Sequence, residues 1–349
     1  MDIETFVRRL PKAELHLHLE GSVRPETFAE LATKNGVKLP IKSDVRELYV
    51  YEDLPAFLVI YDLVCHSILS ADDFRRVTYE ALSSCASGGA RYVEFFFSPH
   101  AHLELGVPYA VMLDGILTGM RDAETDKGVA SRLIPAHSRE RGPAAGLEFL
   151  DMVLADRRDE VIGIGLDYNE APFPPAPFKE MYDRARAAGL HVTAHAGESG
   201  PAANVRDSLD VLHVERIDHG YHVVDDPALV ASCRERGTYF TCCPSTSGIT
   251  SPWKDLAAPD HAIRQMVKAG LNVIINSDDP PMFGTDLANE YVRVATEMRL
   301  SPAELRECAL NGIRGSWLDE GTKRAWLADW SAEIDALAAE LSPPAARRQ

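Results

Sequence analysis

The chain has 349 residues, of which 46% are hydrophobic and 26% charged, so it can bury a sizeable core and is not expected to be disordered. Its formal net charge of -17 argues against a nucleic-acid groove or an anionic membrane surface as a partner, because both favour a surplus of Lys and Arg. The six cysteines form no CxxC pair, which predicts reduced thiols, and no apolar run approaches the roughly 18 residues of a membrane span.

The chain shows no sign of division or of a targeting segment. Residues 1–15 contain no apolar core of signal-peptide length, so we expect a cytoplasmic protein. No repeat, low-complexity tract or long Gly/Ser linker interrupts it, and we expect one domain over 1–349. Only the last segment, 342–349, has the composition of a flexible tail. The oligomeric state stays open.

Short apolar runs rich in β-branched residues alternate along the chain with segments of helical periodicity. The runs that we predict as strands are 13–19, 91–97, 131–137, 161–167, 191–197, 215–221, 238–244 and 271–279. The segments 178–190 and 260–271 have apolar residues at helical spacing and a Gly near the end. This alternation predicts an α/β fold, a (β/α)8 barrel of the TIM type, whose active site lies at the carboxyl ends of the strands.

The connection after the first predicted strand is far longer than an ordinary loop. It runs from about residue 22 to about residue 88 and contains the apolar segment 51–64, whose pattern suits a helix. We therefore expect a helical insertion over the barrel mouth. A lid that keeps water out and a simple packing element are both consistent with it.

Polar residues stand at the ends of several predicted strands, where a barrel brings distant segments together. His16 and His18 are separated by one residue, so on a strand both imidazoles point to the same face. His195 ends the fifth predicted strand, and Asp278 and Asp279 end the eighth. Of these two carboxylates, one can bind metal while the other faces a substrate. Three imidazoles and one carboxylate suit a single Zn2+ with a position left for water.

Two further side chains could transfer protons beside that metal. Glu198 follows His195 by three residues and could exchange a proton with water and substrate. His219 ends the sixth predicted strand and could orient the attacking water, while Gly197 permits a sharp turn and a close approach of substrate. Alternatively, Glu198 only favours a helix start and His219 is a hydrogen-bonded core residue.

These groups fit the hydrolysis of an amine from an electron-poor ring. Zinc lowers the pKa of bound water to about 7, which supplies a nucleophile for a carbon such as C6 of a 6-aminopurine. The ring becomes anionic on attack, so an acid must protonate a ring nitrogen. Glu198 fits that role.

Taken together, the motifs resemble the adenosine deaminase family of the amidohydrolase superfamily. The matching segments are PKAELHLHLEGS from Pro11, HAGE from His195, ERIDHGYH from Glu215 and NSDDP from Asn276. The similarity runs from about residue 10 to about residue 297. It implies a (β/α)8 barrel with one zinc ion that deaminates adenosine or adenine by hydrolysis.

The resemblance also implies a role for each matching residue. The implied zinc ligands are His16, His18, His195 and Asp278. It implies that Glu198 carries a proton to ring N1, that His219 orients the nucleophile and that Asp279 bonds N7 of the purine.

Other positions bear on the size of the substrate. Family members that act on nucleosides carry an Asp that helps hold the ribose where this chain has Glu20, and a Gly near the purine where it has Tyr168. The segments 91–109 and 161–175 look more like the adenine deaminase branch, which has small hydroxyl residues where Tyr168 and Asn169 stand. We expect Glu20 and Tyr168 to contact the substrate, together with Gly197 and Asp279.

Several alternatives remain open. The substrate could be adenosine, adenine, or an N6- or sugar-modified adenine compound. A different metal hydrolase on the same barrel, such as an amidase, is one alternative; those with two metals commonly use a bridging Lys on the fourth strand, and 161–170 contains none, which favours one metal. A cytidine-type deaminase needs a PCxxC motif that the chain lacks. A non-catalytic purine-binding protein would be expected to lose Glu198, His219 or a metal ligand, and all are present. No role follows from the sequence for His66, His100, His102 and His137.

Overall fold

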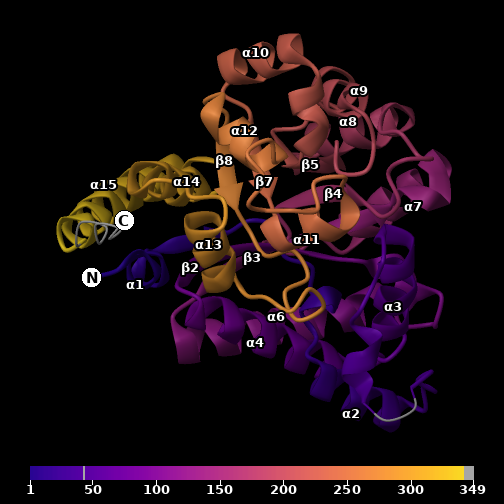
Figure 1. Ribbon diagram of the computed structural model, residues 1–349. Coiled ribbons are helices and arrows are strands. Elements are labelled where there is room, and N and C mark those ends of the chain that lie inside the picture. Colours follow the sequence, from indigo (N-terminus) through magenta and orange to yellow (C-terminus); the bar gives the residue numbers. More distant parts are fainter. Residues whose placement is uncertain (42–43, 342–349) are drawn as a thin grey trace.

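The computed structural model describes residues 1–41 and 44–341, so the tail predicted over 342–349 lies outside the described residues. Its eight strands form one parallel sheet in the order β1 to β8, surrounded by helices (Figure 1). The strands are β1 Lys12–Glu14, β2 Ala90–Phe97, β3 Ala130–Ser138, β4 Gly163–Asp167, β5 His191–Ala196, β6 Arg216–His219, β7 Tyr239–Cys242 and β8 Asn272–Ile275. Each overlaps one predicted run, which confirms the (β/α)8 barrel.

The barrel closes beyond the short strand β1. There Leu17 forms an isolated bridge with Asp278, and His18 forms one with Phe96. The amide of His18 donates to the carbonyl oxygen of Asp278 at 2.9 Å. The strand predicted over 13–19 is therefore interrupted, because its second half pairs with one neighbour and then the other instead of forming one continuous ladder.

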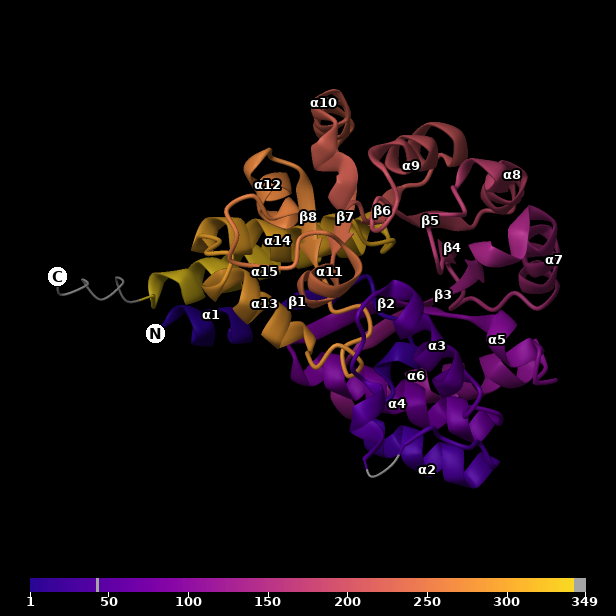
Figure 2. The ribbon, with the colours of Figure 1, turned by 45° about the vertical axis from the view of Figure 1, so that its right-hand side comes forward.

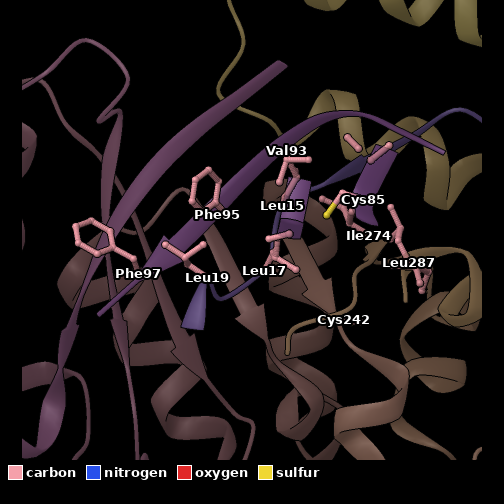
Figure 3. Packing of buried hydrophobic residues seen from close by; sticks show 14 of the residues in the cluster. Leu15, Leu17, Leu19, Cys85, Val93, Phe95, Phe97, Cys242, Ile274 and Leu287 are labelled. Atoms are coloured by element: carbon pink, nitrogen blue, oxygen red, sulfur yellow. The ribbon is translucent and has the colours of Figure 1, made fainter. Parts of the chain in front are cut away.

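Alternation of side chains separates the barrel interior from the layer beneath the helices. Figure 3 shows outward side chains of the first two strand segments in the main apolar cluster, among them Leu15, Leu17, Leu19, Val93, Phe95 and Phe97. Phe96 belongs to a separate small cluster with Ile134 and Ala136. His16 and His18 alternate with the leucines and therefore face the interior.

Helices cover the barrel and complete the αβ units. They are α1 Ile3–Arg9, α2 Pro25–Asn35, α3 Leu54–Cys65, α4 Ala71–Ser87, α5 Pro99–Leu103, α6 Tyr109–Lys127, α7 Gly142–Ala155, α8 Lys179–Ala187, α9 Ala202–Asp207, α10 Pro227–Arg236, α11 Pro244–Thr250, α12 Ala262–Lys268, α13 Leu287–Thr296, α14 Pro302–Arg314 and α15 Glu320–Ala339. Helices α8 and α12 lie within the predicted segments 178–190 and 260–271. Ser70 and Asp73 form a capping box that starts α4.

The long connection between β1 and β2 contains α2, α3 and α4, which Figure 2 shows on one side of the barrel near α6. Helix α4 packs along α6 as part of the outer helical layer. At the opposite end of the chain, α15 packs against α1 and α14, so both ends of the described chain lie on one side (Figures 1 and 2).

All six cysteines are buried and free, as the sequence predicts. Among the helices of the described residues, none has the length and apolar character that crossing a membrane requires.

Candidate metal and catalytic site

One cavity at the carboxyl ends of the strands collects most of the predicted site residues. Those that line it are His18, Tyr168, His195, Glu198, His219, Asp278 and Asp279. Helix α3 contributes Leu54, Phe57, Leu58 and Tyr61 to the opposite wall. The cavity thus has a polar base and an apolar, aromatic cover.

The four predicted metal ligands converge at this base. The Nε2 atoms of His16 and His18 each lie 3.1 Å from Nε2 of His195. Oδ1 of Asp278 is 3.2 Å from Nε2 of His16 and 3.4 Å from Nε2 of His18. All four residues are buried, and together they form a group that could hold a metal ion.

Hydrogen bonds behind the imidazoles turn their lone pairs toward one another. Thr241 Oγ1 donates to Asp218 Oδ1 at 2.9 Å, so it accepts from Nδ1 of His16 at 2.8 Å. Nδ1 of His195 faces the other Asp218 oxygen at 3.5 Å. Nε2 of His16 and Nε2 of His195 therefore present lone pairs to each other, an unfavourable arrangement unless a cation lies between them. The residues present thus fit a bound zinc ion.

Asp218 is a functional residue that sequence reasoning missed. It is fully buried and accepts hydrogen bonds from the hydroxyl groups of Thr193 and Thr241 at 2.8 and 2.9 Å. Burial opposes its ionisation, but the nearby Nδ1 of His195 and the charge of His16 lower its pKa. Its position one residue before His219 was a usable signal, because histidine ligands of metals commonly donate to a carboxylate.

A second possible ligand group combines His16 and Asp278 with His219 and Cys243. The Sγ atom of Cys243 already donates to the carbonyl oxygen of Thr241 at 4.0 Å. His219 is also held by a hydrogen bond of its own, described below. The group with three histidines is therefore the better metal site.

A third group contains Glu20, Cys65 and His102, and the polar atoms of Glu20 and His102 are already engaged. Glu20 accepts hydrogen bonds at 3.0 Å from the amide of Ser98, the hydroxyl of Tyr61 and Nε2 of His102. Glu20 lies behind the cavity wall that Tyr61 forms. Its contact with substrate stays a prediction, and the geometry gives His102 the role of supporting Glu20.

Glu198 and His219 face each other beside the metal ligands. Oε2 of Glu198 lies 3.6 Å from Nε2 of His219. Burial, and then the negative charge of Asp278, raise the pKa of Glu198 to about 8. Its carboxyl group can therefore hold a proton at neutral pH.

The protonation of His219 is set by a neighbouring hydroxyl group. Tyr221 donates to the carbonyl oxygen of Cys243 at 3.0 Å, so it accepts from Nδ1 of His219 at 3.0 Å. Burial and the charge of His16 lower the pKa of His219 well below its usual value. His219 is thus a neutral imidazole whose Nε2 lone pair faces the cavity.

The sequence predicted that Asp278 and Asp279 end the eighth strand. They follow it instead, because β8 stops at Ile275. Asp278 adopts a left-handed backbone conformation with a φ of 65°, which an Asp tolerates only when its surroundings impose it. Oδ1 of Asp279 is buried without a hydrogen-bond partner. A Cβ atom at Gly21 would lie 1.6 Å from this oxygen, so Gly21 is a second residue that the sequence reasoning missed.

Tyr168 and Gly197 occupy the two turns that border the cavity. Tyr168 has a φ of 66° and donates its hydroxyl hydrogen to Asp62 of α3 at 2.8 Å. Gly197 has a φ of 69°, which agrees with the sharp turn expected there. Asp62 had no signal in the sequence, because its partner comes from the far side of the barrel mouth.

The buried ligand group, the carboxylic acid and the neutral imidazole, at the carboxyl ends of a (β/α)8 barrel, define a metal-dependent hydrolase. The family model described as adenosine deaminase matches residues 11–332. The chain therefore belongs to the adenosine deaminase family.

Relatives of known name or structure support this assignment over most of the chain. The adenine deaminase of Ralstonia nicotianae is 38% identical over 322 residues, which are 91% of this chain and 93% of that protein. An amidohydrolase from Burkholderia ambifaria with bound zinc is 40% identical, with a TM-score of 0.91 over 96% of this chain and 93% of that one. The adenine deaminase of Arthrobacter aurescens is 36% identical, with a TM-score of 0.89 over 93% and 99%. The chain is a zinc-dependent hydrolytic deaminase that acts on a purine ring.

Proposed function

We propose that the chain hydrolyses adenine to hypoxanthine and ammonia. The observation that carries this proposal is the position of Tyr168, which reaches from the end of β4 to Asp62 of α3 across the cavity mouth. Its ring also packs edge-on against Tyr61 at 5.9 Å. These side chains occupy the space beside the catalytic groups where a ribose would extend. The adenine deaminases among the relatives support the same choice.

His16, His18, His195 and Asp278 would hold the zinc ion, since their ligand atoms converge. When bound, zinc supplies an activated water molecule at the base of the cavity. The neutral His219 would orient that water through its Nε2 lone pair and stabilise the positive charge that the water oxygen gains as it bonds to C6. Asp279, whose Oδ1 lacks a partner, would bond N7 of the purine, because its raised pKa keeps a hydrogen available.

Glu198 would carry the protons of the reaction. It gives a proton to ring N1 while the water oxygen bonds to C6, and it then takes up the proton that water loses. The hydrogen of the new hydroxyl group passes to the amino group, the bond between C6 and the amine breaks, and ammonia leaves. The product carries a carbonyl group at C6 and a hydrogen at N1.

A second candidate substrate is an N6- or sugar-modified adenine compound. The identity of Tyr168 favours the N6-modified form, because the adenine deaminase branch is expected to carry a small hydroxyl residue at this position, whereas a sugar would meet the Tyr168 side chain. A different side chain at the mouth is consistent with a different substituent on the purine.

The test compares kcat/KM for adenine, adenosine, 2′-deoxyadenosine and N6-substituted adenines in the zinc-loaded protein. We expect adenine to be the best substrate, and Tyr168→Ser and Tyr168→Gly to shift the preference toward adenosine. If adenosine or a modified adenine exceeds adenine in the unaltered protein, the adenine assignment is wrong. An unchanged preference in both variants would show that Tyr168 does not set substrate size.

A further inference from the structure

A buried carboxylate lies directly beneath the turn that carries Glu198. This carboxylate belongs to Glu170, which follows β4 and is fully buried. Its hydrogen-bond donors are the amides of Gly197 at 2.7 Å, Glu198 at 2.9 Å, Ser199 at 3.1 Å and Gly200 at 2.9 Å, and Nδ2 of Asn204 at 2.9 Å. Four consecutive backbone amides and one side chain thus converge on one side chain, as in the anion-binding nests that main-chain amides form.

The turn is built to let this carboxylate approach closely. A Cβ atom at Gly200 would lie 2.6 Å from Oε1 of Glu170, closer than two such atoms can come. Gly200 does not have a positive φ, so backbone conformation alone does not require a glycine there. The space that Gly200 leaves free is occupied by the Glu170 carboxylate together with Nδ2 of Asn204, which would lie 2.4 Å from the same Cβ.

Arg139 provides the balancing charge on the other side of the same strand ends. It is fully buried and donates to the carbonyl oxygens of Asp167 at 3.0 Å and Phe173 at 3.2 Å, and also to that of His195. Arg139 therefore binds carbonyl groups at the ends of β4 and β5, while Glu170 binds the amides that follow β5.

We propose that Glu170 is a positioning residue of the deaminase. It does not line the cavity and touches no reacting atom, but it holds the backbone of Glu198 so that the Glu198 carboxyl group faces His219 and the substrate. The turn also follows directly after His195, so its conformation decides where the proton carrier lies relative to the metal ligands. The inference rests on the deamination reaction, and it holds for whichever 6-aminopurine is the substrate.

Removing the carboxylate should lower kcat more than substrate binding. In Glu170→Ala the amides of the turn lose their common acceptor, and we expect kcat to fall about 100-fold, as a displacement of about 1 Å of a catalytic group does. KM and zinc content should change little, because the ligands and the aromatic wall lie on other segments. Gly200→Ala, which displaces the carboxylate from the opposite side, should give the same pattern.

The variant Glu170→Gln keeps the size of the side chain and one acceptor oxygen, so it separates the loss of hydrogen bonds from the loss of side-chain volume. In Glu170→Gln, the side-chain oxygen can still accept from the amides of 198–200, and the side-chain amide can donate to Asn204 if that residue turns its own amide over. Only the bond from Gly197 is then lost, so kcat should lie well above that of Glu170→Ala. Glu148→Ala removes an exposed carboxylate from helix α7 and serves as the matched control with unchanged kcat.

The experiment measures kcat, KM and zinc content for these variants on the best substrate of the unaltered protein, and amide hydrogen exchange over 195–204. Amide exchange reports the contact between Glu170 and the turn 197–200 without any substrate. A wrong substrate assignment can therefore be distinguished from a wrong role for Glu170. Faster exchange confined to this segment, a selective loss of kcat and a partial recovery of kcat by added formate in Glu170→Ala would support the inference. A kcat within a few-fold of the unaltered value in both Glu170→Ala and Glu170→Gln would overturn it. Loss of zinc together with kcat, without recovery by formate, would also overturn it.

Discussion

At the scale of single residues, the site depends on which side chains hold protons. Burial places the pKa of Glu198 at about 8, whereas His219 next to it stays neutral. We predict that Glu198→Gln keeps its zinc and lowers kcat by about 10²- to 10⁴-fold, the usual contribution of a general acid–base group. Metal analysis and turnover of the same sample check this. Turnover close to that of the unaltered protein would remove Glu198 from the mechanism.

Asp218 influences zinc binding through two of the predicted zinc ligands, His16 and His195. Its oxygens lie near Nδ1 of His16 at 3.9 Å and of His195 at 3.5 Å. We predict that Asp218→Asn weakens zinc affinity about 10- to 100-fold, because the negative charge behind both imidazoles is lost. Competition with a chromogenic chelator measures the dissociation constant. An unchanged constant would mean that Thr241 alone orients the imidazole of His16.

His137 lies away from the cavity and should make stability depend on pH. Burial lowers the pKa of His137 to about 4, and its Nε2 donates to the carbonyl oxygen of Gly142 at 3.1 Å. The unfolded chain binds a proton at this residue below about pH 6.5 while the folded chain does not, so the free energy of unfolding falls as pH falls from about 6.5 toward 4.

The variant His137→Gln keeps a hydrogen-bond donor and removes the titration. Between pH 6.5 and 5 we expect the zinc-free unaltered protein to lose about 2 kcal/mol more unfolding free energy than this variant does. Urea unfolding of both proteins across this range measures the difference. Parallel pH profiles would show that His137 is protonated equally in the folded and unfolded chain.

At the scale of elements, the sequence predicted the strands and the inward-facing histidines well, because side-chain alternation is a local property. His16 and His18 could be placed on one face from their spacing alone. Asp278 was predicted among the metal ligands, but its left-handed backbone beyond the end of β8 was not, because it accompanies a pairing with Leu17 across the barrel seam. The positioning role of Glu170 could not be predicted for a related reason, since most of its hydrogen-bond donors are backbone amides that no pattern of side chains reveals.

Helix α3 is attached to the barrel by polar contacts at two neighbouring residues. Asp62 accepts from Tyr168 at 2.8 Å, and Tyr61 donates to Glu20 at 3.0 Å. We predict that Asp62→Ala increases amide exchange in α3 and raises KM several-fold, with a smaller change in kcat, because the catalytic groups lie on other elements. Asp62→Asn keeps an acceptor for Tyr168 and should resemble the unaltered protein. Equal exchange and KM in all three proteins would show that apolar packing alone holds α3.

At the scale of the whole molecule, the site concentrates carboxyl groups in a chain whose formal charge is already -17. Asp218, Asp278, Asp279 and Glu198 are all buried around one point. Burial and the charge of Asp278 raise the pKa of Asp279 well above its usual range, which shows that the two carboxylates disfavour joint ionisation. A divalent cation offsets this repulsion, so the folded chain should bind zinc far more strongly than the unfolded chain does.

Zinc should therefore stabilise the whole fold, because its predicted ligands come from the first, fifth and eighth strand segments. A ligand that binds only the folded chain adds about 4 kcal/mol when its free concentration is about 1,000 times its dissociation constant. We predict that removing zinc with a chelator lowers Tm, that Tm rises again with free zinc, and that Asp278→Asn weakens this dependence. His222→Ala, which alters a histidine paired with Asp225 near the surface, should keep it. Scanning calorimetry at several zinc concentrations measures this dependence. A Tm that does not change with zinc concentration would mean that the folded chain does not hold the metal at these residues.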